Sequence, residues 1–357
     1  MVRVAVVDYD LCRPDKCGTP CVRFCPINRT RPYKAIELSP AKKNKPVIHE
    51  EFCIACGICV RKCPFKALKI VNLPDEIEEK LIHRYGPNAF KLYGLPTPIK
   101  GKVVGVVGRN GIGKTTAMKI LSGEIVPNLG DYSKNPTPEA VLERFRGTEL
   151  YDYFSKLYSK SLRVVHKVQN IELIPKYLKS AAVKDVLAKI DERGLAKDVI
   201  QALLMESMLN KPVNKLSGGE LQKLAIAAAL CRSADMYIFD EPTSYLDIRE
   251  RLRVATAIRD FLPPDAYAIV VEHDLVVLDY VSDYIVIGFG EPGVYGMFSK
   301  LYSTGSGINF YLDGYLPSEN MRIRDESIRF TLHETREEAE YLQKVGAPLV
   351  EWSTNLL

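Results

Sequence analysis

The sequence predicts an α/β protein in which a small cysteine-rich domain precedes a larger domain built on a mainly parallel sheet. Eight of the nine cysteines lie at positions 12–63, which marks off the first domain. Further along the chain, β-branched strand patterns alternate with amphipathic helix patterns, as in parallel sheets covered by helices. With 357 residues, 46% of them hydrophobic, the chain is long enough for two or three domains.

Composition excludes several classes of protein. No apolar run approaches the roughly 18 residues of a membrane span, and the N-terminus lacks the long apolar core of a signal peptide. We therefore expect a soluble, cytoplasmic protein that has no membrane partner. In a reducing compartment, clustered thiols usually bind metal, so a disulfide scaffold is the less favoured alternative.

Positive charge is concentrated at the N-terminus. Residues 1–74 hold 14 Lys and Arg against 6 Asp and Glu, whereas the whole chain has a net charge of +5. A basic surface of this kind favours a nucleic-acid partner through counterion release. It is equally typical of a solvated face, and charge alone does not separate the two.

The first domain carries a strong cysteine motif. Cys53, Cys56, Cys59 and Cys63 are spaced as C-x₂-C-x₂-C-x₃-C and are followed by Pro64, which is the bacterial ferredoxin run. In that run, the fourth cysteine binds the other cluster of a two-cluster domain. Short β-like runs at 4–7, 34–38 and 69–71 complete a ferredoxin-like unit, which we place at residues 1–74.

A widened copy of the run precedes it. Cys12, Cys17, Cys21 and Cys25 are spaced by four, three and three residues and end in Pro26. The crossover of the two runs predicts two [4Fe–4S] clusters, and paired zinc sites are the alternative. The predicted ligands are Cys12, Cys17, Cys21 and Cys63 for one cluster and Cys25, Cys53, Cys56 and Cys59 for the other.

A nucleotide-binding loop opens the second domain, which we place at residues 75–312. A junction rich in proline, with one short helix expected at 75–83, leads to a strand at 102–107. The segment GRNGIGKT at 108–115 then satisfies G-x-x-x-x-G-K-[ST], and a helix at 115–121 follows it. Its amides can cradle phosphate, Lys114 would contact the β- and γ-phosphates, and Thr115 would bind Mg²⁺.

The helices and strands that follow define the rest of this domain. Strand patterns lie at 163–168, 236–239 and 268–271, and helix patterns at 183–189, 197–209, 221–230 and 248–261. The strand at 236–239 ends in Asp240 and Glu241, so Asp240 can hold the Mg²⁺ shell and Glu241 can orient or deprotonate water. Residues 313–357 form a third segment, in which a charged helix is expected at 334–345.

An insertion at 137–160 predicts a helix-loop-helix. Thr137 can cap the first helix with Pro138 at its first position, Gly147 ends it, and Thr148 can cap the second. The second helix has an apolar and aromatic face that either docks on the parent domain or binds a partner. That face consists of Leu150, Tyr153, Phe154, Leu157 and Tyr158.

A signature loop then indicates a family. The segment LSGGE at 216–220 resembles the signature loop of the ATP-binding-cassette (ABC) ATPases, and the other family motifs follow in order. The resemblance implies that Gln169 is the Q-loop glutamine, that SYLD at 244–247 is the D-loop, and that His273 is the switch histidine. It implies catalytic roles for Glu241, His273 and Gln169. It implies nucleotide binding by Tyr85, Phe90, Asn110, Gly111, Gly113, Lys114, Thr115, Thr116, Gln169, Asp240, Ser217 and Gly219, with Tyr93 as a further candidate for stacking on adenine.

The combination of a cassette with a two-cluster domain resembles one subfamily, ABC subfamily E. These are the ribosome-recycling factors also called RNase L inhibitors. The resemblance covers nearly the whole chain and includes HRY at 83–85, NAFKL at 88–92, FRG at 145–147 and VVEHDL at 270–275.

This resemblance implies a mechanical function. ATP closes two cassettes, the iron–sulfur domain swings, the ribosome is split, and the factor stays on the small subunit. Release, recycling and initiation factors are the implied protein partners. The implied small-subunit contacts lie at 137–160 and 313–330 and include Asp313, Gly314, Tyr315, Arg322, Arg324 and Arg329.

The chain departs from the family because it contains one Walker A loop, one signature loop and one Walker B strand. We therefore expect a truncated form with weak ATPase activity, whose composite sites need a second cassette. A homodimer that pairs Lys114 with Ser217 of another copy is less favoured. Rival functions are an ATP-coupled electron-transfer protein, the ATPase subunit of a transporter, and a purely binding role on the small subunit.

Overall fold

The computed structural model describes residues 2–40, 43–73, 81–86, 89–133, 135–167 and 169–328. The helix expected at 334–345 and the implied contact residue Arg329 lie outside the described residues. The boundary expected at residue 74 also lies outside them and stays a prediction.

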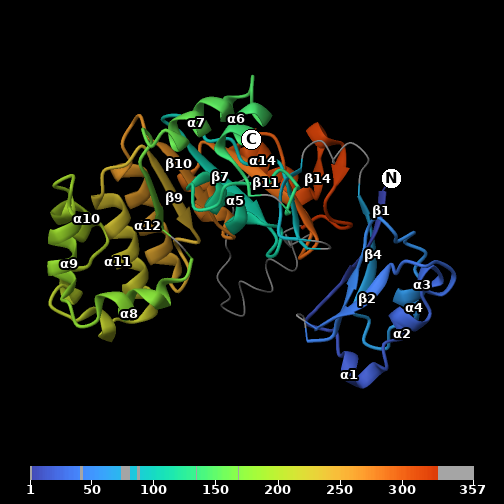
Figure 1. Cartoon of the computed structure of the whole chain (residues 1–357). Helices are drawn as coiled ribbons and strands as arrows, with labels where there is room; N and C mark the ends of the chain where they lie inside the picture. Colours follow the sequence, from blue (N-terminus) through green and yellow to red (C-terminus); the bar gives the residue numbers. More distant parts are fainter. Residues whose placement is uncertain are drawn as a thin grey trace, which may run out of the picture.

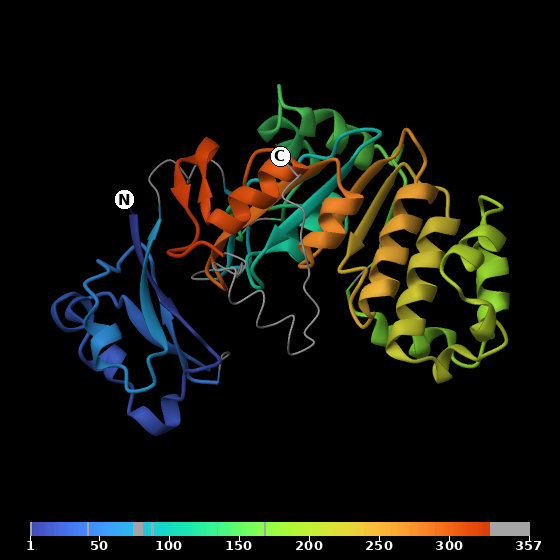
Figure 2. The same cartoon turned by 180° about the vertical axis from the view of Figure 1, so that it is seen from behind.

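The described part of the cysteine-rich domain contains two antiparallel strand pairs and four short helices, and it lies at one end of the molecule (Figures 1 and 2). Strand β1 (Val2–Val7) pairs with β4 (Leu68–Leu73), and β2 (Ile36–Ser39) pairs with β3 (Lys45–Ile48). The strands expected at 4–7, 34–38 and 69–71 are confirmed, whereas β3 was not predicted. The helices are α1 (Pro14–Cys17), α2 (Pro20–Arg23), α3 (Pro26–Thr30) and α4 (Ile58–Lys62).

Among the described residues, a nine-stranded sheet organises the larger domain. Its parallel part has the order β11-β7-β10-β9-β8, and β12, β6 and β5 extend it beyond β11, with β13 also paired to β11. The expected α/β fold with a largely parallel core is confirmed. The strands are β5 (Leu81–Arg84), β6 (Lys91–Tyr93), β7 (Val103–Gly108), β8 (Val164–Lys167), β9 (Met236–Asp240), β10 (Tyr267–Val271), β11 (Tyr284–Glu291), β12 (Tyr295–Phe298) and β13 (Tyr302–Ser303).

Alternate side chains of the parallel strands fill two separate cores. Tyr237 and Phe239 of β9 point into the core shared with helices α9 to α12, whereas Met236 and Ile238 point into the core shared with α5. This alternation is what a sheet buried on both faces requires. The helices on the first face are α8 (Ile174–Leu178), α9 (Val183–Ile190), α10 (Ala196–Ala202), α11 (Gly218–Cys231) and α12 (Ile248–Phe261), and α5 (Lys114–Leu121) covers the second.

The predicted helix-loop-helix is present as α6 (Pro138–Arg144) and α7 (Glu149–Tyr158), drawn in green in Figure 1. Thr137 caps α6 by accepting a hydrogen bond from the amide of Ala140 at 3.3 Å. The aromatic face of α7 docks on the parent domain, since Tyr153 and Phe154 are almost fully buried in the α5 core. The hydroxyl of Tyr153 donates to the carbonyl of Leu121 at 2.6 Å, which fixes the insertion to the end of α5.

Two helix predictions need correction. The helix expected at 75–83 is wrong for its described part, because Leu81–Arg84 form β5 and pair with β6 at the edge of the sheet. The helix expected at 197–209 ends at Ala202, and Leu204 has a left-handed backbone with φ +49°. That turn buries Leu203 and Met205 in the core and leaves Leu204 half exposed, so tertiary packing overrides helix propensity here.

Helix α13 (Leu275–Val281) connects β10 to β11 and adds Val277 and Val281 to the first of the two cores. The described elements after the sheet are α14 (Thr304–Asp313), β14 (Tyr315–Leu316) and β15 (Met321–Arg322). In the described part of the chain, no helix combines the length and apolar character needed to cross a membrane.

Candidate functional site

The candidate site lies where the parallel strands β7, β8, β9 and β10 reach their carboxyl ends. The P-loop follows β7, Asp240 ends β9, and His273 comes two residues after β10. Gln169 comes two residues after β8, whose Lys167 pairs with Phe239 of β9. Because the carboxyl ends of parallel strands meet at one edge, four segments far apart in sequence converge there.

The P-loop is closed around the side chain of Lys114. Its ammonium donates to the carbonyls of Gly108 at 2.8 Å and Arg109 at 2.9 Å. Burial lowers the pKa of Lys114 to about 8, and the nearby carboxylates of Glu241 and Asp240 oppose that shift. The ammonium is thus held in a poorly hydrated place where a phosphate would be a strong partner.

Gly113 shows how tightly the loop is built. It has φ +88°, and a Cβ there would lie 2.5 Å from Cζ of Phe90. Only glycine combines this backbone with this close approach of an aromatic ring. Phe90, one of the two favoured aromatic residues, therefore packs directly on the loop.

The remaining aromatic candidates differ in exposure. The ring of Tyr85 is 55% exposed, and its hydroxyl lies 3.1 Å from Oγ1 of Thr116 on the P-loop helix. Tyr93 is 3% exposed and packs in the sheet beside Tyr295, so it has no face free for a base. The structure thus brings Tyr85 to the phosphate loop and leaves Tyr93 in the core.

The two predicted Mg²⁺ ligands meet directly. Oγ1 of Thr115 donates to Oδ2 of Asp240 at 3.2 Å. Burial raises the pKa of Asp240, while Thr115 and Lys167 favour its charged form. A hydroxyl and a carboxylate side by side are the hard oxygen donors that Mg²⁺ prefers, so the residues present fit the ion.

Glu241 stands in a strained and well-braced turn. It is a non-glycine residue with φ +48°, a conformation that costs L-residues about 1 kcal/mol. Its carboxylate accepts a hydrogen bond from Ser244 Oγ at 3.2 Å and lies 3.5 Å from Nε2 of His273. Burial, with help from Lys114, lowers the pKa of His273, which keeps its imidazole neutral near pH 7.

The signature loop caps a helix on the other side of the sheet. Ser217 and Glu220 form a reciprocal capping box at the start of α11, with Ser217 N donating to Glu220 at 2.9 Å. Helix α11 packs in the core on one face of the sheet, whereas the P-loop helix α5 packs in the core on the other. Ser217 and Gly219 therefore belong to a different face of the molecule from Lys114.

Two residues that hold this site were not identified from the sequence. Lys167 donates to the carbonyls of Asp240 at 2.8 Å and Glu241 at 3.1 Å, and Gln222 donates to the carbonyl of Glu241 at 2.8 Å. Both are buried. A lysine inside an apolar strand pattern was the available signal for Lys167, whereas Gln222 is hidden in a helix with no distinguishing spacing.

One cavity in the cysteine-rich domain gathers four of the predicted cluster ligands. Cys25, Cys53, Cys56 and Cys59 all line it. Burial raises the pKa of Cys59 to about 11, and Cys53 and Cys56 add to that shift by charge repulsion. The donor set fits an iron–sulfur cluster, because each thiol need reach only its own iron around a shared volume.

The other four thiols are also close to one another. Burial raises the pKa of Cys21 to about 11, and the thiols of Cys17, Cys12 and Cys63 contribute in the same direction. In the described part of the chain, no three His, Cys, Asp or Glu side chains are arranged to hold a single metal ion. The division of the eight thiols between two clusters stays a prediction, and the shared cavity of Cys25, Cys53, Cys56 and Cys59 is consistent with it.

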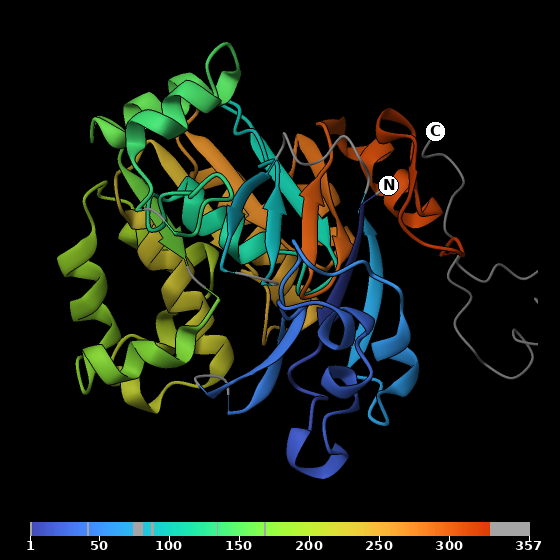
Figure 3. The same cartoon turned by 45° about the vertical axis from the view of Figure 1, so that its right-hand side comes forward.

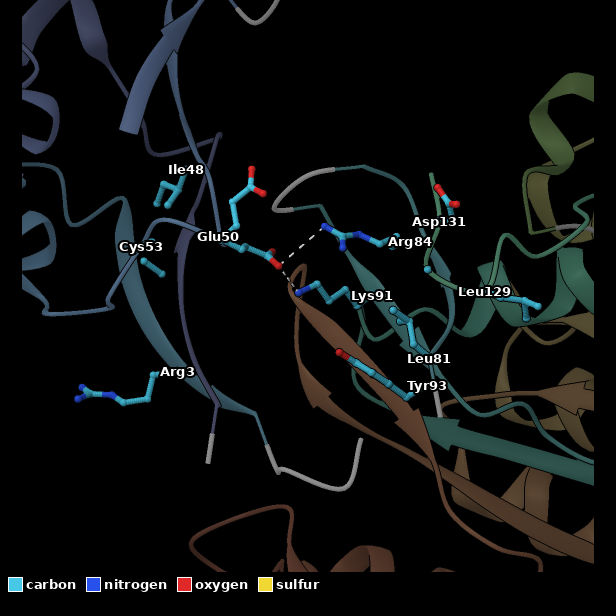
Figure 4. A pocket seen from close by; sticks show the side chains of 13 residues that line it. Arg3, Ile48, Glu50, Cys53, Leu81, Arg84, Lys91, Tyr93, Leu129 and Asp131 are labelled. Carbon is cyan, nitrogen blue, oxygen red and sulfur yellow. Dashed lines mark hydrogen bonds and ion pairs between the residues drawn. The ribbon is translucent and has the colours of Figure 1, made fainter. Parts of the chain in front are cut away.

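The cysteine-rich domain lies beside the larger domain (Figure 3), and a polar contact close to Cys53 joins the two (Figure 4). Oε2 of Glu50, three residues before Cys53, accepts a hydrogen bond from Lys91 Nζ at 2.7 Å and lies 3.8 Å from Nη2 of Arg84. These side chains line a cavity of about 660 Å³ between the cysteine-rich domain and strands β5 and β6. Lys91 directly follows Phe90, so this contact connects the cluster domain to the hairpin that carries the aromatic candidates.

Two family models match the cysteine-rich domain, and one matches the nucleotide-binding domain. The model described as "Possible Fer4-like domain in RNase L inhibitor, RLI" matches residues 2–31, and the "4Fe-4S binding domain" model matches residues 46–69. The "ABC transporter" model matches residues 98–244. The fold class and the two iron–sulfur cofactors expected from the sequence are thereby confirmed.

Relatives extend over nearly the whole chain. The chain is 46% identical over 338 residues to ABC transporter E family member 1 of Arabidopsis thaliana, covering 95% of this chain and 56% of that protein. Translation initiation factor RLI1 of Saccharomyces cerevisiae is 44% identical over 342 residues, with 95% and 56% covered. The chain thus spans about half the length of the curated relatives that it matches.

Solved structures give the same relationship. A chain in the structure titled "Model of ribosome-bound archaeal Pelota and ABCE1" is 51% identical, with a TM-score of 0.85, and the match covers 92% of this chain and 55% of that one. A structure titled "RNase-L Inhibitor" is also 51% identical, with a TM-score of 0.70 over 73% of this chain and 50% of that one. From its cysteine-rich domain, its cassette and these relatives, we conclude that the chain belongs to ABC subfamily E, the family of the RNase L inhibitor and RLI1 proteins.

Proposed function

We propose that this chain is the iron–sulfur and first-cassette part of an ATP-hydrolysing ribosome-recycling factor. The observation that carries the proposal is the contact of Thr115 with Asp240 at 3.2 Å, which joins the two ATPase motifs. The same chain holds eight thiols in its cysteine-rich domain. Relatives named translation initiation factor RLI1, and a similar structure described as ribosome-bound, support the ribosomal part.

The P-loop at 108–115 and the exposed Tyr85 would bind ATP. Lys114 would exchange its carbonyl partners for the β- and γ-phosphates, with Asn110, Gly111 and Gly113 shaping the loop around them. Tyr85 would stack on adenine, with Phe90 supporting the loop from behind. Thr115 and Asp240 would hold Mg²⁺, which when bound neutralises charge on the phosphates.

Hydrolysis falls to the residues at the end of β9 and β10. Glu241 would orient a water molecule and take its proton, and its carboxylate lies 3.5 Å from Nε2 of His273. His273, kept neutral by burial, can donate one hydrogen bond towards the γ-phosphate. Gln169 is exposed two residues after Lys167, the last residue of β8, and it would meet the same water.

The site is half of a composite one in this proposal. Ser217 and Gly219 start a helix on the face of the sheet opposite to α5, so they are available to an opposing cassette. The second half of the site would come from a second cassette, and a second copy of this chain is the alternative. ATPase activity that rises with the square of chain concentration would indicate pairing of copies.

Two surfaces are the proposed contacts with the small ribosomal subunit. Because Tyr153 and Phe154 are buried, the partner face of the helix-loop-helix must be its exposed polar side, which includes Arg144, Arg146 and Lys160. The second surface is the segment from Asp313 onwards, where Arg322 is exposed. Release, recycling and initiation factors are further proposed partners.

Co-sedimentation tests this function. The cluster-reconstituted chain is mixed with purified small ribosomal subunits, with and without a non-hydrolysable ATP analogue, beside Lys114→Ala. Saturable binding to small subunits is expected, with Lys114→Ala abolishing any nucleotide dependence. Absence of binding by this chain and by a protein that also carries the second cassette would refute the ribosomal role.

A further inference from the structure

The carbonyl of Glu241 receives two hydrogen bonds from buried side chains that come from different elements. Lys167, at the end of β8, donates from 3.1 Å, and Gln222, on α11, donates from 2.8 Å. The amide of Glu241 donates to the carbonyl of Val271 at 2.9 Å. The peptide groups on both sides of this left-handed residue are thus tied down.

Burying the two donor side chains, Lys167 and Gln222, is unfavourable for the stability of the fold. Lys167 is 5% exposed and Gln222 is fully buried, and Oε1 of Gln222 has no hydrogen-bond partner among the described residues. Burying an ammonium group and an incompletely satisfied amide destabilises a fold unless both do something useful. What the two side chains share is one oxygen atom, the carbonyl of Glu241.

We propose that Lys167 and Gln222 are positioning residues that hold the Glu241 carbonyl and so fix the direction of the Glu241 carboxylate. The inference rests on the proposed ATPase function of Glu241. A left-handed backbone is unfavourable for a glutamate, so Glu241 would relax to another backbone conformation if its carbonyl were released. Relaxation would swing the carboxylate away from His273, which now lies 3.5 Å from it.

Each of the two donors lies close in sequence to a motif of the proposed ATPase. Lys167 lies two residues before Gln169, and Gln222 lies one turn after the signature glycines at the start of α11. A residue next to the loop that would meet water and a residue of the helix that would meet the opposing nucleotide therefore both donate to the carbonyl of Glu241. A shift of either element reaches Glu241 through one hydrogen bond.

Three variants and a matched control test the proposal in the full chain. Lys167→Met and Gln222→Leu remove a donor with little change in volume, and Lys167→Arg keeps a donor and a charge. Lys223→Met is the control, because Lys223 follows Gln222 on the same helix but pairs with Glu250. The measurements are the ATP dissociation constant, the single-turnover hydrolysis rate at saturating ATP, and hydrogen exchange in peptides that cover 240–247.

Lys167→Met and Gln222→Leu are each expected to slow hydrolysis about tenfold, as loss of a buried hydrogen bond does, with the dissociation constant changed by no more than about twofold. Exchange in 240–247 should rise by a similar factor. Lys167→Arg should recover most of the rate and protection, and Lys223→Met should match the wild type.

Unchanged rate and unchanged exchange in both donor variants would overturn the inference. Equal loss of ATP binding and of hydrolysis would also overturn it, since that indicates general damage to the fold. If the wild-type chain neither binds nor hydrolyses ATP, the proposed function fails instead, and the exchange of 240–247 still decides whether these side chains hold Glu241.

Discussion

ATP binding by this chain should weaken as the pH rises above about 8, because the ammonium of Lys114 is buried before the nucleotide arrives. Burial disfavours the charged form and lowers the pKa of Lys114 to about 8. Phosphate oxygens favour the charged form, so binding ATP requires the protonated lysine. At a pH above 8, binding must therefore take up a proton, and affinity is lost as that proton becomes scarce.

The magnitude follows from the same value. At pH 9, about one tenth of the free protein would hold a protonated Lys114, so affinity should fall about tenfold, or about 1.4 kcal/mol. Between pH 6.5 and 7.5 the lysine is mostly protonated and the affinity should be nearly flat. Glu241 raises the pKa of Lys114, so Glu241→Gln should move the decline to lower pH.

The assay is a fluorescence titration with an ATP analogue in Mg²⁺ at each half unit from pH 6.5 to 9.5. Lys114→Arg is the control for charge, because a guanidinium stays protonated throughout this range and should give a flat profile at its own affinity. Lys167 has a pKa lowered by burial to the same value of about 8. Lys167→Met should therefore keep the decline if Lys114 is the titrating group.

A wild-type affinity that stays constant from pH 7 to 9.5 would refute the reasoning. It would mean that the loop hydrates Lys114 better than its buried position indicates. If the loss of ATP affinity at high pH disappears in Lys167→Met, the titrating group is Lys167 and not Lys114.

Three further outcomes are expected. Cys59→Ser removes one thiol from the cavity-lining set, so the purified chain should hold about half the iron of the wild type, and unchanged iron content would contradict its place in a cluster. In Glu241→Gln, the ATP dissociation constant at pH 7 should stay within about twofold of the wild type, whereas single-turnover hydrolysis should be at least about a hundredfold slower. Normal hydrolysis would exclude a general base at this position. Tyr153→Phe removes the hydroxyl that donates to the carbonyl of Leu121 at 2.6 Å and should lower the free energy of unfolding, measured by calorimetry, by about 1–2 kcal/mol. The control Tyr151→Phe should have a smaller effect, and equal effects of the two substitutions would argue against this hydrogen bond.

Local sequence signals predicted most of the fold. The strand at 236–239 and the helix at 248–261 carry strong periodicity, and both are present with nearly the expected bounds. The strand at 45–48 was missed because a lysine and a proline occupy half of it. The stretch at 81–84 was misread as helix because its strand pairing depends on Lys91–Tyr93, which no local pattern reveals.

The candidate site divides in the same way. Residues with fixed spacing, such as Lys114, Asp240 and the cysteines, were identified because their chemistry is tied to a motif. Lys167 and Gln222 were not, since their partner is a backbone carbonyl that lies far away in the sequence. A hydrogen bond to a carbonyl selects no residue type strongly, so it leaves no motif.

The sequence by itself determined which chemistry this chain can hold: thiols in two crossed runs, a phosphate loop, and a pair of acids after a buried strand. Each of these depends on contacts within a few residues, which spacing encodes directly. The tertiary structure alone decided which side chains share a cavity, which aromatic is exposed beside the loop, that α7 docks its aromatic face, and how Glu241 is held. Those properties depend on which distant segments the parallel sheet brings to one edge, and burial and strand pairing set that through the whole fold.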